Sequence, residues 1–387
     1  MVILISAKMT KLRVFIETRH ILRNRALAVC GLIVLTLSVG SQSGQAQQDQ
    51  ILRKPSRTIP TLDGLPHIPL LRGEFLTWCG DRAVMRVDGG LEVHDAASKP
   101  FTLSYLIGDG LECSSDGQKL TYDDREAHRV LRSDVFAGAI PQEIATYEKP
   151  EFLRRPILLF SHDSKSVVTT KPLTLPAGAA SLNVILLNGE AASPIGWNRD
   201  STEFFAVARS REASKDGLVE VFNIQLQLIG SGSLPKGSLW RGGWFANSQI
   251  LYLYLGSEKD EFGVGYVLKC RIEDWKCERI ASNVLEASVG GDGVLGIVQP
   301  VGKYSHNGEW ETVPQRSVAE IRKGSRALAR QVFEFKDRHS LKIAISPSGM
   351  KAVLTWFQRS DAGCPPESRK DDECKGAMLI DLSGALN

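Results

Sequence analysis

The residues best suited to chemistry in this 387-residue chain are its seven cysteines. Cys30 lies in an apolar N-terminal segment, which leaves six cysteines in the rest of the chain. These form three candidate pairs, Cys270–Cys277, Cys364–Cys374 and Cys79–Cys113. A metal site is the rival interpretation, but no pair has the C-x-x-C spacing and no histidine lies nearby as a further ligand. The pattern favours disulfides, which form in an oxidising compartment.

Side chains that could transfer protons or bind metals are present but scattered. Six isolated histidines follow the N-terminal segment: His67, His94, His128, His162, His306 and His339. Carboxylates gather at 123–124, 258–261 and 371–373, where none has the spacing of a calcium loop and solvated loops are the simpler interpretation. No G-x-S-x-G nucleophile motif occurs. The sequence therefore predicts no catalytic residue, no metal site and no cofactor.

The first 46 residues have the order of a secretory signal. A basic stretch over 8–25 precedes an apolar run over 26–39 and a small, polar segment over 40–46. Gly44 and Ala46 suit the −3 and −1 positions of a cleavage after Ala46. The apolar run is shorter than the roughly 20 residues that a membrane-spanning helix needs. We therefore expect a periplasmic or secreted protein without a stable membrane span, with an N-terminally membrane-anchored protein as the alternative.

Removal of this segment changes the charge of the chain. The full sequence has 47 basic and 44 acidic residues, of which six and one lie within 1–46. The remaining chain therefore carries 41 basic and 43 acidic residues, a net charge of −2. Because the basic excess belongs to the signal, no nucleic-acid partner is expected.

The rest of the chain is predicted to consist of short strands, because apolar or alternating runs are broken throughout by Gly, Asp, Asn, Ser and Pro. These strands must therefore position any functional side chains. A strand–turn–strand unit recurs seven times, at 78–84, 113–122, 160–168, 197–205, 244–250, 290–295 and 345–356. Its turn residues are Asp81, Asp116, Asp163, Asp200, Asn247, Asp292 and Ser348. Such side chains bond the backbone just after them, which favours a tight turn. Repetition at this spacing is typical of propellers and other repeat folds.

These units resemble the S-x-D-G-K-x-L/V-x-F/Y pattern of the WD40-like repeats (PD40) in the exported TolB family. The segment 113–122 matches best, whereas the units at Asp163 and Asp200 have Ser in place of Gly and the unit at Ser348 has Ser in place of Asp. The resemblance implies an all-β fold, a single β-propeller over 66–387, with seven blades and with six or eight as alternatives. No segment matches the N-terminal domain of TolB, so its role in the Tol system is not implied.

The final unit predicts how the ring closes. Residues 341–346, 350–357 and 377–382 would supply three strands of the last blade, and a strand within 59–71 would supply the outer one. The N- and C-terminal ends would then pair, after an extended leader at 47–65. Two segments have helix-like spacing, 124–133 and 316–330, although a charged strand also fits the second.

Two functions remain open for such a ring. Propeller loops suit recognition, so we expect a monomeric, non-enzymatic scaffold for an envelope protein or glycan. The alternative is a lyase or glycoside hydrolase whose carboxylates or histidines converge on the central channel from different blades. Trp197, Trp240, Trp244 and Trp356 lie in or beside the repeat strands, where they would line a pocket or pack between blades.

Overall fold

The computed structural model describes residues 61–386 with internal gaps. The gaps are 71–72, 88–89, 96–97, 104–108, 115, 125, 149–156, 178–181, 188–191, 209–216, 258–262, 302–315, 335–338, 359–368 and 371–372. Two compact units divide the chain, Met1–Thr58 and Ile59–Asn387, and all described residues belong to the second. The expected signal segment therefore lies outside the described residues.

Short strands form seven sheets, which follow one another along the chain. The first contains β2 (Glu74–Cys79), β3 (Arg82–Val87), β4 (Gly90–Asp95) and β5 (Ser98–Leu103). The second contains β6 (Asp109–Cys113), β7 (Lys119–Asp124), β8 (Arg129–Asp134) and β9 (Gln142–Thr146). The third contains β10 (Leu158–Phe160), β11 (Ser166–Thr169) and β12 (Asn183–Leu186). The fourth contains β13 (Ala192–Trp197), β14 (Glu203–Ala208), β15 (Leu218–Asn223) and β16 (Leu228–Ser233).

The remaining three sheets complete the fold. The fifth contains β17 (Ser238–Asn247), β18 (Ile250–Ser257), β19 (Gly265–Arg271) and β20 (Cys277–Val284). The sixth contains β21 (Glu286–Val289), β22 (Val294–Pro300), β23 (Arg316–Lys323) and β24 (Arg326–Glu334), with the 3-10 turn η2 (Gly291–Gly293) after β21. The seventh contains β25 (His339–Ile345), β26 (Lys351–Gln358), β28 (Glu373–Asp381) and β1 (His67–Leu70), with β27 (Arg369–Lys370) paired to β28.

The burial of each strand follows its position in its sheet. The second strand β18 is buried on both faces along almost its whole length, whereas the outermost strand β16 alternates between exposed and half-buried residues. Apolar side chains of neighbouring sheets pack together: Val84 and Leu91 of the first sheet share a core cluster with Leu120 and Tyr122 of the second. A single sheet cannot cover both of its faces, so the sheets must stack to exclude water.

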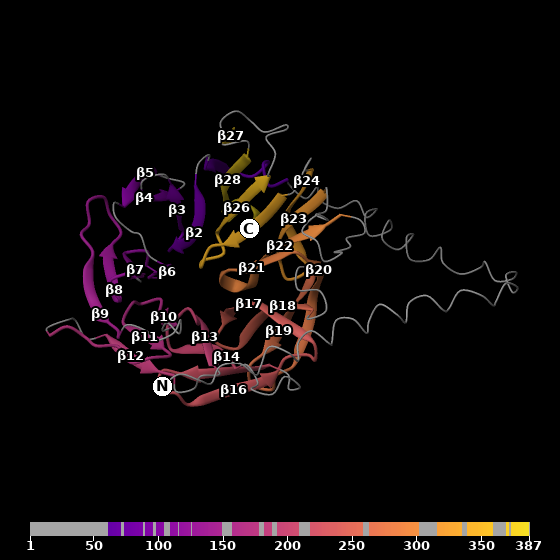
Figure 1. Cartoon of the computed structure of the whole chain (residues 1–387). Helices are drawn as coiled ribbons and strands as arrows, with labels where there is room; N and C mark the ends of the chain where they lie inside the picture. Colours follow the sequence, from indigo (N-terminus) through magenta and orange to yellow (C-terminus); the bar gives the residue numbers. More distant parts are fainter. Residues whose placement is uncertain are drawn as a thin grey trace, which may run out of the picture. The chain divides into compact units, whose positions relative to one another are not determined.

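The seven sheets are the blades of a β-propeller. The inner strands β2, β6, β10, β13, β17, β21 and β25 each contact the next one in this order, and β2 also contacts β26 of the seventh blade. Figure 1 shows these strands around a common centre, with the chain order running around the ring. The expected fold and the expected number of seven blades are therefore confirmed.

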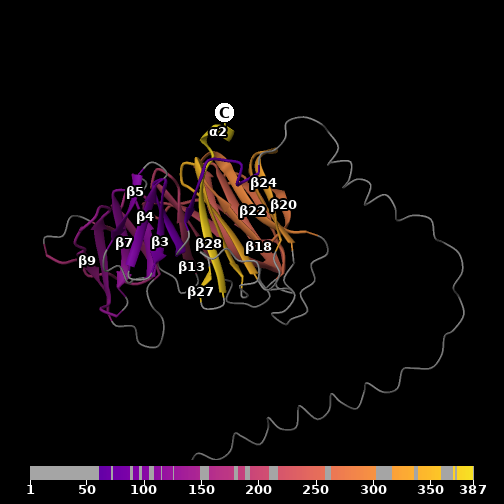
Figure 2. The same ribbon diagram turned by 90° about the horizontal axis from the view of Figure 1, so that it is seen from above.

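The two ends of the described chain close the ring. Strand β1 pairs antiparallel with β28, with His67 opposite Ile380 and Leu70 opposite Ala377. The expected strand order of the last blade is thus confirmed. The helical turn α2 (Ser383–Leu386) follows β28 and contacts β24 of the sixth blade (Figure 2).

The third blade departs from the pattern. It has three described strands, and β12 runs parallel to β11 rather than antiparallel. The connection between these strands crosses toward the second blade, where Thr174 forms a bridge with Thr146. This detour brings the chain back to the edge of β11 from the opposite end, which explains the parallel pairing.

Three expectations from the sequence need correction or refinement. The helix-like segment 124–133 forms the end of β7, a turn and most of β8, because its apolar residues fill the core of a blade. The segment 316–330 forms β23, a turn and part of β24, in agreement with the charged-strand alternative. The end of the expected leader is packed rather than extended, since Leu62 is completely buried in the core cluster that joins the sixth and seventh blades.

Candidate ligand-binding channel

The turn after the inner strand is built around a buried polar side chain in four blades. These side chains are Ser114, Ser161, Asn198 and Ser346, which are at most 3% exposed. In the second blade, Ser114 Oγ donates to Asp116 Oδ1 over 2.5 Å and accepts the backbone N–H of Lys119 over 2.9 Å. Asp116 Oδ1 also accepts the backbone N–H of Gln118 over 2.9 Å. These bonds hold the turn in one conformation and explain why hydrogen bonding lowers the pKa of Asp116.

The other blades repeat this arrangement with different chemistry. Ser161 Oγ donates to Asp163 Oδ1 over 2.6 Å in the third blade. In the fourth blade, Asn198 Oδ1 accepts the backbone N–H groups of Thr202 and Glu203, so Asn198 takes the place that Ser114 and Ser161 have in their turns. The Ser or Asn two positions before the Asp, or before Ser348 in the seventh blade, therefore accepts the backbone hydrogen bond that closes the turn, and we call it the hub of the turn. In the sequence, the first Ser of the S-x-D pattern indicates this residue.

The fourth position of these turns has a left-handed backbone. Gly117 and Gly349 have φ angles of 70° and 76°, and Ser164 and Ser201 have angles of 58° and 59°. A Cβ at Gly117 would lie 2.8 Å from the carbonyl oxygen of Cys79, so the close approach of the first two blades also requires glycine there. Ser164 and Ser201 adopt the same left-handed conformation in the third and fourth blades, although it is uncommon for residues other than glycine.

All seven inner strands and their turns enclose one cavity along the propeller axis, with a volume of about 1180 Å³. Six of the seven turn residues that the sequence singled out line it: Asp81, Asp116, Asp200, Asn247, Asp292 and Ser348. The seventh, Asp163, is not part of the lining, and its neighbour His162 takes that place. The repeat turns therefore form one rim of a central channel.

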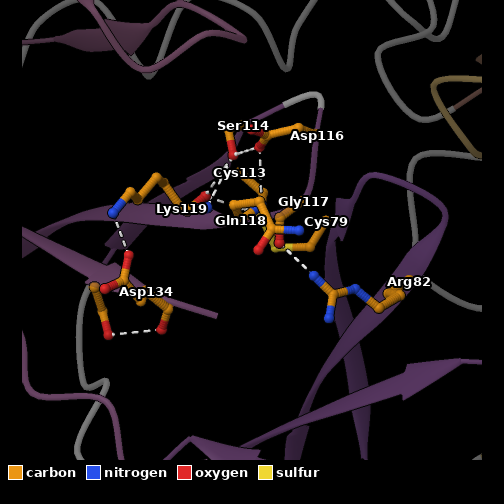
Figure 3. The surroundings of a disulfide bond; sticks show 10 residues. Cys79, Arg82, Cys113, Ser114, Asp116, Gly117, Gln118, Lys119 and Asp134 are labelled. Atoms are coloured by element: carbon orange, nitrogen blue, oxygen red, sulfur yellow. Dashed lines mark hydrogen bonds and ion pairs between the residues drawn. A yellow bond between two sulfur atoms is a disulfide. The ribbon is translucent and has the colours of Figure 1, made fainter. Parts of the chain in front are cut away.

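Hydrogen bonds connect the turns of neighbouring blades into this rim. Ser348 Oγ of the seventh blade donates to Asp81 Oδ1 of the first over 2.6 Å. The backbone N–H of Asp163 donates to Ser201 Oγ of the fourth blade over 3.1 Å. A guanidinium N–H of Arg82 donates to the carbonyl oxygen of Gly117 (Figure 3). The rim is consequently a rigid surface rather than a set of independent loops.

Two of the three expected disulfides are confirmed. Cys79–Cys113 joins the ends of the inner strands β2 and β6, directly at the channel wall, with 4.9 Å between the Cα atoms (Figure 3). Cys270–Cys277 joins the facing strands β19 and β20 of the fifth blade, as the expected hairpin register requires. In the third pair, Cys374 lies in β28 but Cys364 lies outside the described residues, so Cys364–Cys374 stays a prediction.

Aromatic side chains line the channel from the first, fourth and fifth blades. Trp197 and Trp244 belong to the lining, and so does Trp78, which sequence reasoning passed over. Trp197 is almost completely buried and donates its indole N–H to the carbonyl oxygen of Leu159 over 3.1 Å, so it is a core residue that touches the channel. Trp240 and Trp356 pack against core clusters between blades instead.

Glu112 is the most perturbed acidic residue of the channel wall. It lies on β6, beside Cys113, and burial raises the pKa of its carboxyl to about 8. Among the described residues no charge or hydrogen bond offsets this burial. The Glu112 carboxyl is therefore predominantly protonated at neutral pH, although nothing in the sequence around it marks the residue as special.

A row of polar residues continues from Glu112 across the second blade. Thr121 lies directly opposite Glu112, and Arg132 lies directly opposite Thr121, so the three residues share one face of the sheet. Thr121 Oγ1 and Arg132 Nε are buried and have no hydrogen-bond partner among the described residues. Buried polar atoms without partners are uncommon in folded proteins, so this row is a feature that needs an explanation.

The histidines within the described part of the chain do not converge on one site. His162 lines the channel, where burial lowers its pKa, whereas His94 bonds Glu92 over 3.0 Å in the first blade and His67 lies in β1. His306 lies outside the described residues. Among the described residues no group of three or more His, Cys, Asp and Glu side chains could hold a metal ion.

Fold and channel together define a seven-bladed β-propeller whose axial cavity is the candidate binding site. No model of a known protein family matches the chain, and no curated protein matches it. Within the described part of the chain, no helix has the length and apolar character to cross a bilayer. The two disulfides indicate an oxidising, extracytoplasmic location.

Solved structures with a similar fold are propellers or contain one. A prolyl endopeptidase is 12% identical with a TM-score of 0.45, and the match covers 88% of this chain and 52% of the endopeptidase chain. The Dos1 propeller is 11% identical with a TM-score of 0.44, and the match covers 82% of this chain and 94% of the Dos1 chain. The propeller domain of the Trilobed protease from Pyrococcus furiosus is 12% identical with a TM-score of 0.34, and the match covers 75% of this chain and 77% of that domain's chain. The chain spans only 41% of the length of a similar acylaminoacyl peptidase.

Proposed function

We propose that this protein is an exported, non-enzymatic scaffold of the cell envelope that binds a protein or glycan at the rim of its channel. One observation carries the proposal: all seven blades contribute a turn to a single open cavity, and hydrogen bonds within and between the turns hold this surface rigid. A rigid surface loses little conformational entropy when it binds a partner. The resemblance of the repeats to TolB-like units agrees with an exported scaffold.

Export is the second part of the proposal. The basic and apolar segments before residue 40 resemble a secretory signal, and a cleavage after Ala46 would leave Gln47 as the first residue. Oxidation of Cys79 with Cys113 and of Cys270 with Cys277 fits folding outside the cytoplasm. The alternative is a protein that stays anchored by its N-terminal segment.

The experiment uses the full chain with a C-terminal affinity tag, expressed in its source organism and recovered from the envelope fraction. We expect an intact mass that begins at Gln47 and the capture of one dominant protein or glycan. Asp200 is exposed on the rim, so Asp200→Arg is expected to reduce capture about tenfold, which corresponds to about 1.4 kcal/mol.

The matched control is Glu143→Arg, which changes an exposed acidic residue on β9, outside the channel lining. It is expected to capture the partner as well as the unchanged protein does. Equal loss of capture in both variants would reject the rim as the binding surface. An intact mass that includes residues 1–46 would favour the anchored alternative over cleavage.

A second candidate function is favoured by Glu112. A carboxyl that stays protonated near neutral pH is suited to general acid catalysis, as in a glycoside hydrolase or lyase. Incubation of the purified protein with a library of oligosaccharides tests this function. Turnover that Glu112→Gln abolishes would establish the enzyme and overturn the scaffold, whereas intact oligosaccharides would leave the scaffold as the better account.

A further inference from the structure

The type of residue that lines the channel differs from blade to blade. Partly exposed aromatic side chains line it from the first and fifth blades: Phe75, Trp78, Trp244 and Phe245. The sixth and seventh blades contribute mainly small or aliphatic residues there, including Ser288, Val289, Gly290, Ala344 and Ile345. The partly exposed aromatic surface therefore comes from two separate parts of the ring, the first and the fifth blades, with the sixth and seventh blades between them.

Irregular pairing distinguishes four of the inner strands from the other three. Strands β2, β6, β13 and β17 each contain a register shift, located between Phe75 and Thr77 in β2 and between Trp240 and Gly242 in β17. Strands β10, β21 and β25 pair without a shift. Bulges re-aim side chains and are common beside binding sites. The irregular strands are those that present aromatic residues and Glu112 to the channel.

The polar row of the second blade begins in one of these irregular strands, β6. Glu112 borders the cavity, and the unpartnered Thr121 Oγ1 is its direct neighbour on the same sheet face. The charged or titratable groups of the adjoining elements include Glu74 in the first blade, Lys119, Tyr122, Asp123, Asp124 and Arg132 in the same blade, and His162 and Asp163 in the turn of the third blade. None of them stabilises the ionised form of Glu112 enough to offset its burial.

We propose that the channel binds a neutral oligosaccharide, whose ring faces pack on Trp78 and Trp244 and whose hydroxyl groups hydrogen-bond the Glu112 carboxyl. The C–H faces of sugar rings are apolar and pack well on aromatic rings, while their hydroxyl groups donate and accept hydrogen bonds. A protonated carboxyl matches them, because it donates one hydrogen bond and accepts others. This inference rests on the proposed binding function and names the class of ligand.

A cationic ligand is the main competitor. The rim carries Asp81, Asp116, Asp200 and Asp292, but Asp81 accepts a bond from Ser348 and Asp116 is bonded within its own turn. On the channel wall, the neutral form of Glu112 offers a cation little attraction. The wall thus presents a neutral donor beside aromatic faces, which suits a neutral polyhydroxylated ligand better than a cation.

The test uses the full chain after export, purified and titrated with cellotetraose, chitotetraose, maltotetraose and, separately, a tetralysine peptide. Binding is followed by tryptophan fluorescence and by calorimetry between pH 6 and pH 9.5, a range chosen from the pKa of about 8 for Glu112. We expect at least one tetrasaccharide to bind and tetralysine not to bind. The affinity should fall above about pH 8, because the ionised carboxylate loses its donor.

Three variants sharpen the test. Glu112→Gln keeps a neutral donor and is expected to bind with no such fall in affinity above pH 8. Glu112→Leu removes the donor without adding a charge and should weaken binding about tenfold, as the loss of one ligand hydrogen bond requires. Glu143→Gln, outside the channel lining, should bind like the unchanged protein at every pH. Circular dichroism and urea unfolding confirm that each variant is folded.

Several outcomes would overturn the inference. Folded protein that binds none of the tetrasaccharides, or that binds tetralysine instead, has a different class of ligand. Equal binding by Glu112→Leu and the unchanged protein would remove Glu112 from the site. The proposed scaffold function survives these results if the envelope partner is still captured and Asp200→Arg still reduces capture, whereas it fails separately if no partner is captured.

Discussion

At the scale of single residues, Glu112 is unusual because burial alone sets its acidity. The carboxyl has a pKa of about 8, and no described charge opposes the shift. Other acidic residues of the channel behave differently: Asp116 is held in its turn by hydrogen bonds that lower its pKa. The same type of side chain therefore serves either as a fixed structural acceptor or as a protonated donor, depending on its distance from solvent and its bonding partners.

The raised pKa of Glu112 in the folded protein predicts how the free energy of unfolding depends on pH. The unfolded chain releases the Glu112 proton near pH 4.5, whereas the folded protein keeps it until about pH 8. Between these values the folded state binds more protons, so the free energy of unfolding decreases as the pH rises. Glu112→Gln should remove this slope and should be the more stable protein at pH 9, by an amount on the order of a few kcal/mol.

Urea unfolding at pH 5, 7 and 9 measures the effect. Glu143→Gln is the control, because Glu143 is exposed and should leave the pH dependence of the unchanged protein intact. A Glu112→Gln variant that loses stability with pH as steeply as the unchanged protein would show that Glu112 is ionised in the folded state.

At the scale of elements, the inner strand with its turn is the unit that builds the channel. The hub side chains fix each turn, and the Cys79–Cys113 disulfide joins the inner strands of the first two blades. Cys270–Cys277, by contrast, joins two strands that are already neighbours in one blade. The two bonds therefore restrict the unfolded chain to different extents.

The disulfides should consequently differ in their contribution to stability. The sequence separations are 34 and 7 residues. Loop-closure entropy predicts about 4 kcal/mol for the first bond and about 2.5 kcal/mol for the second. We expect the paired change Cys79→Ala with Cys113→Ala to lower the free energy of urea unfolding more than Cys270→Ala with Cys277→Ala does. The opposite order would mean that the link between blades contributes little to the folded ring.

At the scale of the whole molecule, the fold depends on closure of the ring by its own ends. Strand β1 completes the seventh blade, and Leu62, just before it, is completely buried among residues of the sixth and seventh blades. Without these contacts the seventh blade would lose its outer strand, and the core between the last two blades would be open to water. Closure therefore stabilises the channel although it lies far from the channel wall.

Truncation of the buried leucine tests this closure. Leu62→Ala should lower the free energy of unfolding by about 2–5 kcal/mol, because it leaves a cavity in a packed core. Ile140→Ala, at a residue that is 82% exposed, should change it by less than about 0.5 kcal/mol. Both values come from urea unfolding of the purified protein. A small effect at Leu62 would imply that the segment before β1 detaches without loss of the ring.

The sequence by itself determined the repeating unit and two disulfide pairings, and it predicted the closing strand and seven blades, with six or eight as alternatives. The alternation of strands, the Ser-x-Asp turns and the spacing of Cys270 and Cys277 are local patterns, whereas the closing strand and the Cys79–Cys113 pair were inferred from what the other units and cysteines left over. The tertiary structure decided the channel. Glu112 carries no local motif, Trp78 and Trp244 begin two separate repeat units, and only the circular packing of seven blades places the three residues around one cavity. The burial that raises the pKa of Glu112 exists only in the folded protein, and no motif in the sequence around Glu112 indicates it.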